Sequence, residues 1–254
     1  MTLQPIGLTG MADKSLGQHW LRDRAVLDKI AELAGKGETC LEIGPGLGAL
    51  TSSLLHRFER VVAVEFDADL ARKLPGSFPG KNLEVVNEDI LKFDFNKMPD
   101  DYVVAGNIPY YITSPIIEKV LTVAKLPSKV VLLMQKEVAE RVADEKETVL
   151  SLFVKNRADV ELGPVVKAEM FTPPPKVESQ VLLLTPHEPI VSENVFSIIK
   201  LGFSSSRKKL IHNLTPLKSK TELIEIFKKL DLSLDARPTD LHLDDYERLL
   251  NNML

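Results

Sequence analysis

A glycine-rich turn follows a short apolar run in the segment Leu41-Glu42-Ile43-Gly44-Pro45-Gly46-Leu47-Gly48. Leucines at helical spacing come next, at Leu50, Leu54 and Leu55. A strand that passes through such a turn into a helix is typical of a doubly wound α/β sheet. Because glycine has no Cβ, the backbone of the turn can approach a ligand closely. The segment therefore predicts a ligand site at the carboxyl edge of a parallel sheet.

Acidic residues stand at the ends of the next two predicted strands. Glu65 lies about twenty residues after the turn, where a carboxylate can accept hydrogen bonds from a ribose diol. Asp89 follows the third strand and can accept from an adenine amino group. This pattern alone fits both a dinucleotide and S-adenosylmethionine. The G-x-G-x-G spacing and Pro45, which lacks an amide that a pyrophosphate would use, favour S-adenosylmethionine.

Short runs rich in valine, isoleucine and leucine alternate with helical patterns through the first two thirds of the chain. This alternation predicts an α/β fold with a Rossmann-like, mostly parallel sheet. Two late apolar runs, 160–166 and 180–184, are expected to form an antiparallel hairpin at the edge of that sheet. The other expected strands are 39–43, 60–66, 83–87, 102–106 and 129–134, and the expected helices are 47–57, 68–74, 114–125, 137–144 and 149–158.

The pattern changes after residue 184. The segment Thr185-Pro186-His187-Glu188-Pro189 is typical of a linker, and only helical patterns follow it, at 193–203, 207–213, 220–230 and 243–253. We therefore expect two domains: 1–186 with the ligand site, and a small all-helical domain over 187–254.

Composition excludes several classes of protein. With 44% hydrophobic and 27% charged residues among 254, the chain is neither disordered nor fibrous. Its net charge is −4, so a nucleic acid must be bound by a local basic patch. The single cysteine, Cys40, permits no intramolecular disulfide, and no secretory signal or membrane span is recognisable. We expect a cytoplasmic protein, and the absence of metal-ligand spacing predicts no metal site.

A second motif, Asn107-Ile108-Pro109-Tyr110, follows the fourth predicted strand. These residue types suit methylation of an exocyclic amino group, whose nitrogen lone pair is delocalised into a base. The Asn107 side-chain carbonyl and a main-chain carbonyl near Pro109 can each accept one N–H, which localises the lone pair. Tyr110 offers a flat face on which an extruded base can stack. The motif therefore predicts amino-methyl transfer.

Together these motifs resemble the ribosomal RNA adenine N6,N6-dimethyltransferases along nearly the whole chain. The resemblance includes Gly17-Gln18-His19-Trp20-Leu21 near the start and Met134-Gln135-Lys136-Glu137-Val138. It continues through Phe171-Thr172-Pro173-Pro174-Pro175-Lys176-Val177-Glu178-Ser179, which is improbable in an unrelated chain. The family pattern has Asn-Phe where this chain has His19-Trp20.

The resemblance implies S-adenosylmethionine as cofactor and two adjacent adenines in a small-subunit rRNA hairpin as substrate, within a pre-ribosomal particle. It also implies that Phe171 lies opposite Tyr110, so that the two rings sandwich the target adenine. A monomer is expected. The predicted cofactor-binding residues are His19, Leu21, Gly44, Gly46, Glu65, Asp89 and Asn107, and the predicted catalytic residues are Asn107, Pro109, Tyr110 and Phe171.

A basic strip lies in the predicted helical domain. No acidic residue occurs between Asn194 and Thr221, and we expect this strip to bind RNA phosphates. Its predicted RNA-binding residues are Lys200, Arg207, Lys208 and Lys209.

Three alternatives remain open from the sequence. A large-subunit methyltransferase of the resistance type shares the Asn107–Tyr110 motif, although the triple proline and Gly17-Gln18 favour the small-subunit enzyme. A non-catalytic ribosome-assembly factor on the same scaffold is the second alternative. A dinucleotide oxidoreductase is the third.

Overall fold

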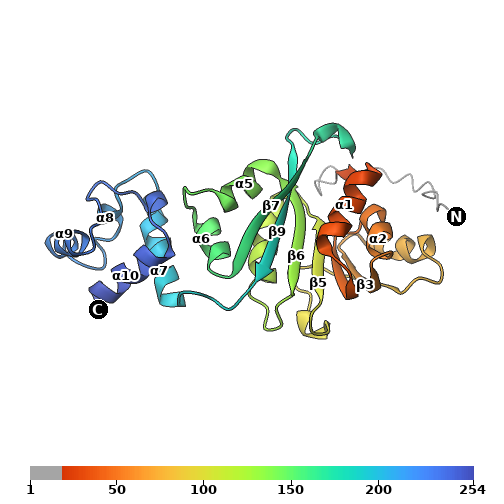
Figure 1. Cartoon of the computed structure of the whole chain (residues 1–254), viewed down its shortest axis with the longest axis horizontal. Helices are drawn as coiled ribbons and strands as arrows, with labels where there is room; N and C mark the ends of the chain where they lie inside the picture. The colour runs from red at the N-terminus through yellow and green to blue at the C-terminus, as the bar shows by residue number, and fades with distance from the viewer. Residues whose placement is uncertain (1–18) are drawn as a thin grey trace. The chain divides into compact units, whose positions relative to one another are not determined.

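The computed structural model describes residues 19–254, and a seven-stranded sheet carries the predicted ligand site. The sheet has the order β4-β3-β2-β5-β6-β9-β7, and several of its strands are labelled in Figure 1. The pairs from β4 through β6 are parallel, and β9 runs antiparallel to β6. The predicted mostly parallel sheet with two late strands at its edge is thereby confirmed. The strands are β2 Gly37–Ile43, β3 Phe58–Glu65, β4 Leu83–Asn87, β5 Val103–Asn107, β6 Lys129–Gln135, β7 Ala158–Val166 and β9 Ser179–Pro186.

The central strands are apolar because helices and loops cover both faces of the sheet. Cys40 in β2, Val61 in β3, Ala105 in β5 and Val131 in β6 are all fully buried in one cluster. The chain leaves β2 first toward β3 and β4 and later toward β5 and β6, so the strand order reverses between β2 and β5. Ligands of open α/β sheets bind at the carboxyl ends of strands at such a reversal.

One helix of the sheet unit has no counterpart in the sequence-based prediction. Helix α1, Arg24–Ala34, begins at Asp23, whose side chain accepts a hydrogen bond from Val26 N, and its buried face packs beside α2 (Figure 1). A second unpredicted element is a two-stranded sheet in which β1, Trp20–Leu21, pairs with β8, Phe171–Thr172. The other helices around the sheet are α2 Ala49–Leu54, α3 Ala68–Lys73, α4 Thr113–Val120, α5 Lys136–Ala143 and α6 Val149–Lys155.

The chain divides into two compact units. The first takes the described residues up to Ala139 together with Val160–Pro186, and the second takes Glu140–Asp159 and His187–Leu254. The boundary expected between 186 and 187 is one of these divisions. The segment 140–159, which the sequence placed with the first domain, groups with the second unit instead. Leu152 of α6 causes this, since it is buried in the core of the second unit.

Every regular element within 187–254 is helical, as the sequence predicts. Phe196, Ile199, Phe227 and Tyr246 contribute large buried side chains to its core. None of the helices in the described part of the chain is long and apolar enough to cross a bilayer. The main helices of this unit are α7 Glu193–Gly202, α8 Leu210–Asn213, α9 Lys220–Lys229 and α10 Leu243–Met253.

Candidate active site

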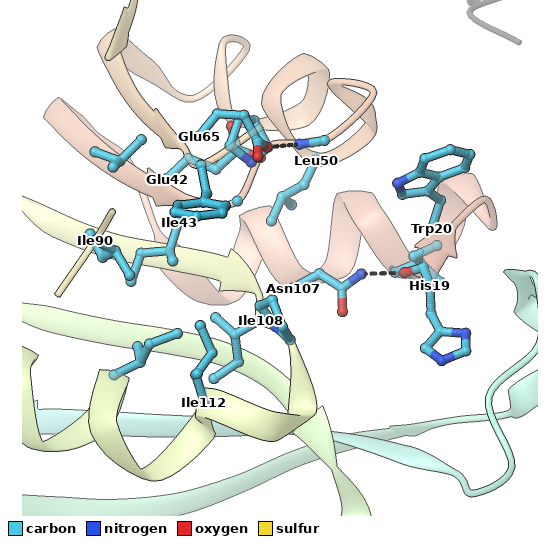
Figure 2. A pocket seen from close by; sticks show the side chains of 18 of the residues that line it. His19, Trp20, Glu42, Ile43, Leu50, Glu65, Ile90, Asn107, Ile108 and Ile112 are labelled. Carbon is cyan, nitrogen blue, oxygen red and sulfur yellow. Dashed lines mark hydrogen bonds between the residues drawn. The ribbon is translucent and has the colours of Figure 1, made fainter. Parts of the chain in front are cut away.

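A cavity of about 290 Å³ lies at the carboxyl edge of the sheet, where the strand order reverses. Its walls come from the turn after β2, the ends of β3, β4 and β5, and the residues around β1 (Figure 2). Phe171 does not line the cavity. The predicted site residues that do line it are His19, Leu21, Gly44, Gly46, Glu65, Asp89, Asn107, Pro109 and Tyr110.

The glycine turn after β2 depends on backbone conformations that favour glycine. Gly44, Gly46 and Gly48 have φ values of +64°, +55° and +83°. Gly44 N donates to Val64 O at 3.0 Å, which fixes the start of the turn against β3. A Cβ built on Gly44 would meet no heavy atom within 4 Å, so this part of the turn is open to a ligand.

Glu65 at the end of β3 is joined to this turn. Its Oε2 accepts a hydrogen bond from Gly46 N at 3.0 Å, and its Oε1 accepts one from Asp67 N at 2.9 Å. Burial raises the pKa of Glu65, and these two amide hydrogen bonds lower it. Each carboxylate oxygen has a second lone pair, so the group can still accept from the hydroxyls of a ribose.

The charge of the lining separates two classes of ligand. Four acidic residues line the cavity, but burial keeps Glu42 mostly protonated, so that Glu65, Glu88 and Asp89 are the lining acids that can carry negative charge. None of the lining residues in the described part is a lysine or arginine. A pyrophosphate would meet these acids without a cationic partner, whereas a cationic nucleoside is attracted to them. The cavity therefore suits a positively charged nucleoside ligand better than a dinucleotide.

Glu42 is a site residue that the sequence reasoning did not assign. Its side chain is 1% exposed, and its Oε2 has no hydrogen-bond partner among the described residues. Burial raises the pKa of Glu42 to about 8, although the nearby Thr51 lowers it, and the neighbouring Glu65 carboxylate adds to the rise. The group is therefore mostly protonated at pH 7. An acid within the apolar run of β2 was the signal that could have identified it.

Asn107 ends β5 with its amide in a fixed orientation. Its Nδ2 donates to the main-chain oxygen of His19 at 3.0 Å. Figure 2 shows the nitrogen directed at His19 and the side-chain oxygen turned away from it. The Pro109 carbonyl accepts from Ile112 N at 3.3 Å, and the Thr113 hydroxyl lies between Tyr110 O at 3.2 Å and Pro109 O at 3.5 Å. The side-chain oxygen of Asn107 is therefore the atom of this amide that is available to a further donor.

Tyr110 follows this strand in a short 3₁₀ helix, Tyr110–Ile112, and its ring is half-buried. Its hydroxyl shares a hydrogen bond with Ser179 Oγ at 2.6 Å. Burial raises the pKa of Tyr110, and this hydrogen bond lowers it. The ring of His19 stacks against it, with ring centroids 5.9 Å apart and an angle of 24° between the planes.

Phe171 is 3% exposed and packs in the apolar cluster of the sheet unit, and its backbone pairs with that of Leu21 in β1. Its predicted place opposite Tyr110 in the target-base pocket stays a prediction. Gly17 and Gln18, which contribute to the resemblance, lie outside the described residues.

The basic strip of the second unit is exposed. Lys200 lies on α7, and Arg207 and Lys208 lie in the segment before α8. Lys209 forms an ion pair with Asp235, so an acid lies beside the strip although none occurs within it in sequence. The RNA-binding role of these residues stays a prediction.

Comparison with known proteins gives consistent results. The model of a family described as "Ribosomal RNA adenine dimethylase" matches residues 11–253. A protein from Mycoplasma capricolum named ribosomal RNA small subunit methyltransferase A is 34% identical over 94% of this chain and 97% of its own length. A protein of the same name from Acaryochloris marina is 39% identical over 94% of this chain and 96% of its own length.

Two solved structures are also similar along most of the chain. A dimethyladenosine transferase from Plasmodium falciparum has a TM-score of 0.78 and 28% identity, over 92% of this chain and 96% of that one. The 23S rRNA methyltransferase ErmE has a TM-score of 0.75 and 27% identity, over 92% of this chain and 99% of that one.

Proposed function

The chain belongs to the ribosomal RNA adenine dimethylase family, and from this premise we propose that it dimethylates N6 of two adjacent adenines in a small-subunit rRNA hairpin. S-adenosylmethionine is the methyl donor in this proposal. The substrate is rRNA within a pre-ribosomal particle, and the enzyme acts as a cytoplasmic monomer.

The observation that carries the proposal is the orientation of Asn107. Because its amide nitrogen is held by His19 O, its oxygen is available to accept an N–H from the amino group of an adenine. The Pro109 carbonyl already accepts a hydrogen bond from Ile112 N within the 3₁₀ turn, so we assign the second acceptor to the preceding carbonyl, that of Ile108. Two acceptors localise the nitrogen lone pair on the side that faces the methyl donor.

The other residues bind and orient. When bound, S-adenosylmethionine supplies a methyl group on a positively charged sulfur. Glu65 accepts hydrogen bonds from the ribose, and Asp89 accepts from the adenine amino group of the cofactor. Gly44 allows the ligand to approach the main chain, since no Cβ occupies that space. No general base is required, because the product ammonium can release its proton to solvent.

The large-subunit alternative is less well supported than the small-subunit one. ErmE is named for 23S rRNA and shares the fold. The two curated relatives are named for the small subunit and are 34% and 39% identical over almost their full lengths. We therefore favour small-subunit rRNA. Incubating the enzyme with labelled cofactor and each rRNA, followed by mass-spectrometric mapping of methylated adenines, distinguishes the two.

We expect Asn107→Ala to lower methyl transfer by about 100-fold or more, the usual scale for losing one preorganised transition-state partner. The measurement is transfer of labelled methyl groups to small-subunit rRNA, together with the melting temperature. Asn87→Ala is the matched control. Asn87 ends β4 as Asn107 ends β5, and its side chain donates to Glu65 O and Phe66 O, but it does not line the cavity. Wild-type turnover by Asn107→Ala would remove the role assigned here.

The non-catalytic alternative and the oxidoreductase are tested by ligand binding. Trp20 is the only tryptophan of the chain, and it lines the cavity, so its fluorescence reports occupancy directly. We expect S-adenosylhomocysteine to change this fluorescence and to raise the melting temperature, since a ligand of the native state stabilises it. Stabilisation by NAD instead would favour the oxidoreductase. Binding without transfer to either rRNA would favour the non-catalytic factor.

A further inference from the structure

Two large aromatic side chains at the cavity are exposed to solvent. Among the exposed large hydrophobic side chains of the described residues, only Phe66 and Tyr111 are aromatic. Both line the cavity, with 64% and 62% of their surface exposed. A single exposed apolar residue needs no explanation, but these two rings lie at the rim of one cavity rather than scattered over the surface.

The two rings lie on opposite sides of β2 in the order of the sheet. Phe66 follows Glu65 at the end of β3, on the side where the proposed function places the cofactor ribose. Tyr111 comes after β5, which ends at Asn107 and is the neighbour of β2 on the other side. Tyr111 therefore belongs to the side of the cavity that the target adenine occupies in the proposed function.

The turn that carries Tyr111 is anchored so that its ring faces solvent. Successive side chains of a 3₁₀ helix point about 120° apart, so the half-buried Tyr110 and the exposed Tyr111 face different directions. The buried Thr113 hydroxyl donates to Tyr110 O at 3.2 Å, which holds the end of this turn. Among the described residues, the Tyr111 hydroxyl has no hydrogen-bond partner and its ring stacks on no other ring.

Extrusion of a base creates a need for such a ring. A target adenine that enters the cavity leaves the stack of its strand, and its neighbour loses a stacking partner. That neighbour stays at the rim of the cavity, because one phosphodiester joins it to the target nucleotide. An aromatic side chain at the rim replaces the lost stacking, since every base has a face that suits it. Tyr111 has the exposure and the position that this role requires.

We propose that Tyr111 is a stacking platform for the nucleotide that adjoins the target adenine in the RNA strand. This inference rests on the proposed function and deepens it, since it names a second base subsite outside the cavity. The platform lies on one side of the cavity, so it receives either the 5′ or the 3′ neighbour of the target. For one adenine of the adjacent pair, that neighbour is the other adenine.

The test uses small-subunit rRNA into which a synthetic hairpin segment has been ligated, either intact or with an abasic nucleotide in place of one adenine of the pair. Methylation of the remaining adenine is compared with that of the same adenine in the intact rRNA. Loss of stacking on one ring predicts that wild-type kcat/KM falls by about 5- to 100-fold for one of the two abasic versions.

The variants decide whether Tyr111 causes that loss. Tyr111→Ala should lose the same factor at the same adenine of the intact rRNA, and the abasic nucleotide should then cost it nothing more, because ring and base form one contact. Tyr111→Phe keeps the ring and should behave as the wild type. Phe66→Ala is the matched control, since it removes the other exposed ring of the cavity. The abasic nucleotide should cost Phe66→Ala the same factor as the wild type.

Two further measurements separate this role from others. The melting temperature of Tyr111→Ala should equal that of the wild type, because the ring is exposed. Trp20 fluorescence should show unchanged affinity for S-adenosylhomocysteine, because Tyr111 and Glu65 lie on opposite sides of β2.

The results that would overturn the inference differ from those that would overturn the proposed function. Wild-type kcat/KM in Tyr111→Ala, or an undiminished effect of the abasic nucleotide in that variant, removes the platform. Weaker binding of S-adenosylhomocysteine by Tyr111→Ala also overturns the inference, because it assigns the ring to the cofactor. No methylation of either rRNA by the wild-type enzyme overturns the proposed function and, with it, this inference.

Discussion

Glu42 is a carboxyl group enclosed in the sheet beside the cavity, and its burial has a consequence for stability. In the folded protein its pKa is about 8, against 4.5 for the free group. At pH values between 4.5 and 8, Glu42 is protonated in the native state and ionised in the unfolded chain. The free energy of unfolding contributed by this group is therefore greatest below pH 4.5 and is lost as the pH rises through 8.

We expect Glu42→Gln to remove this dependence. Between pH 5 and 8 the free energy of unfolding of the wild type should fall relative to the variant by about 1.4 kcal/mol per pH unit, the value for one proton. Urea unfolding followed by circular dichroism at several pH values measures the two slopes. Glu59→Gln, on the exposed start of β3, is the control and should behave as the wild type. Parallel slopes for Glu42→Gln and wild type would contradict the buried, protonated state.

At the residue scale, motif reasoning placed Glu65, Asp89 and Asn107 around one cavity, because each stands at the carboxyl end of a parallel strand. It placed Phe171 there as well, but Phe171 is not among the residues that line the cavity. An aromatic residue fits a stacking wall and a buried core equally well, so the sequence alone does not indicate that Phe171 packs in the apolar cluster of the sheet unit. The stack of His19 on Tyr110 joins segments 91 residues apart, which no local pattern indicates.

The glycine turn predicts different effects for two substitutions of the same kind. At Gly48 a Cβ would lie 2.7 Å from Leu74 Cδ1 and 2.8 Å from Phe78 Cε2, and φ is +83°. Gly48→Ala should therefore destabilise by about 2–5 kcal/mol, from overpacking and left-handed strain together. At Gly44 only the strain applies, and Gly44→Ala should cost about 1–2 kcal/mol.

Cofactor affinity should show the opposite order, with the larger loss in Gly44→Ala and the smaller in Gly48→Ala. Gly44→Ala places a methyl group where the ligand approaches the main chain, so binding of S-adenosylhomocysteine is lost while the fold persists. Urea unfolding and Trp20 fluorescence measure the two properties. Gly35→Ala is the control, since Gly35 has φ +97° and no neighbour within 4 Å but ends α1 away from the cavity. Unchanged affinity in Gly44→Ala would contradict this use of the turn.

Most elements were predictable because the parallel strands are continuous apolar runs bounded by polar residues. Helix α1 was not predicted, although Asp23, Gly35 and the spacing of Leu27, Ile30 and Ala31 were visible signals. The pairing of β1 with β8 could not be predicted, since two-residue strands carry no periodicity and owe their pairing to tertiary contacts. Helix α8 begins at Leu210 rather than 207, because residues 203–205 form a 3₁₀ turn before it.

At the scale of the whole molecule, a net charge of −4 requires that RNA be held by a local patch. We expect Arg207→Glu/Lys208→Glu to weaken binding of small-subunit rRNA about equally for all sequences. Affinity decreases as salt concentration rises, and the slope of log affinity against log salt concentration measures this dependence. The slope should become less steep by about 0.7–0.9 for each phosphate that the variant no longer neutralises. Filter binding at several salt concentrations measures it. Lys228→Glu/Lys229→Glu, at the exposed end of α9, is the control of equal charge change, and an equal weakening there would contradict a localised patch.

The division of the chain into interleaved units bears on how it folds during synthesis. When residue 186 has been made, every part of the first unit exists, but 140–159 still lacks the partners it meets in 187–254. At that point Leu152 lacks the core in which it is buried, and Arg157 lacks the ring of Phe196 over which it lies. The second unit can therefore complete its core only after the C-terminal segment has been made.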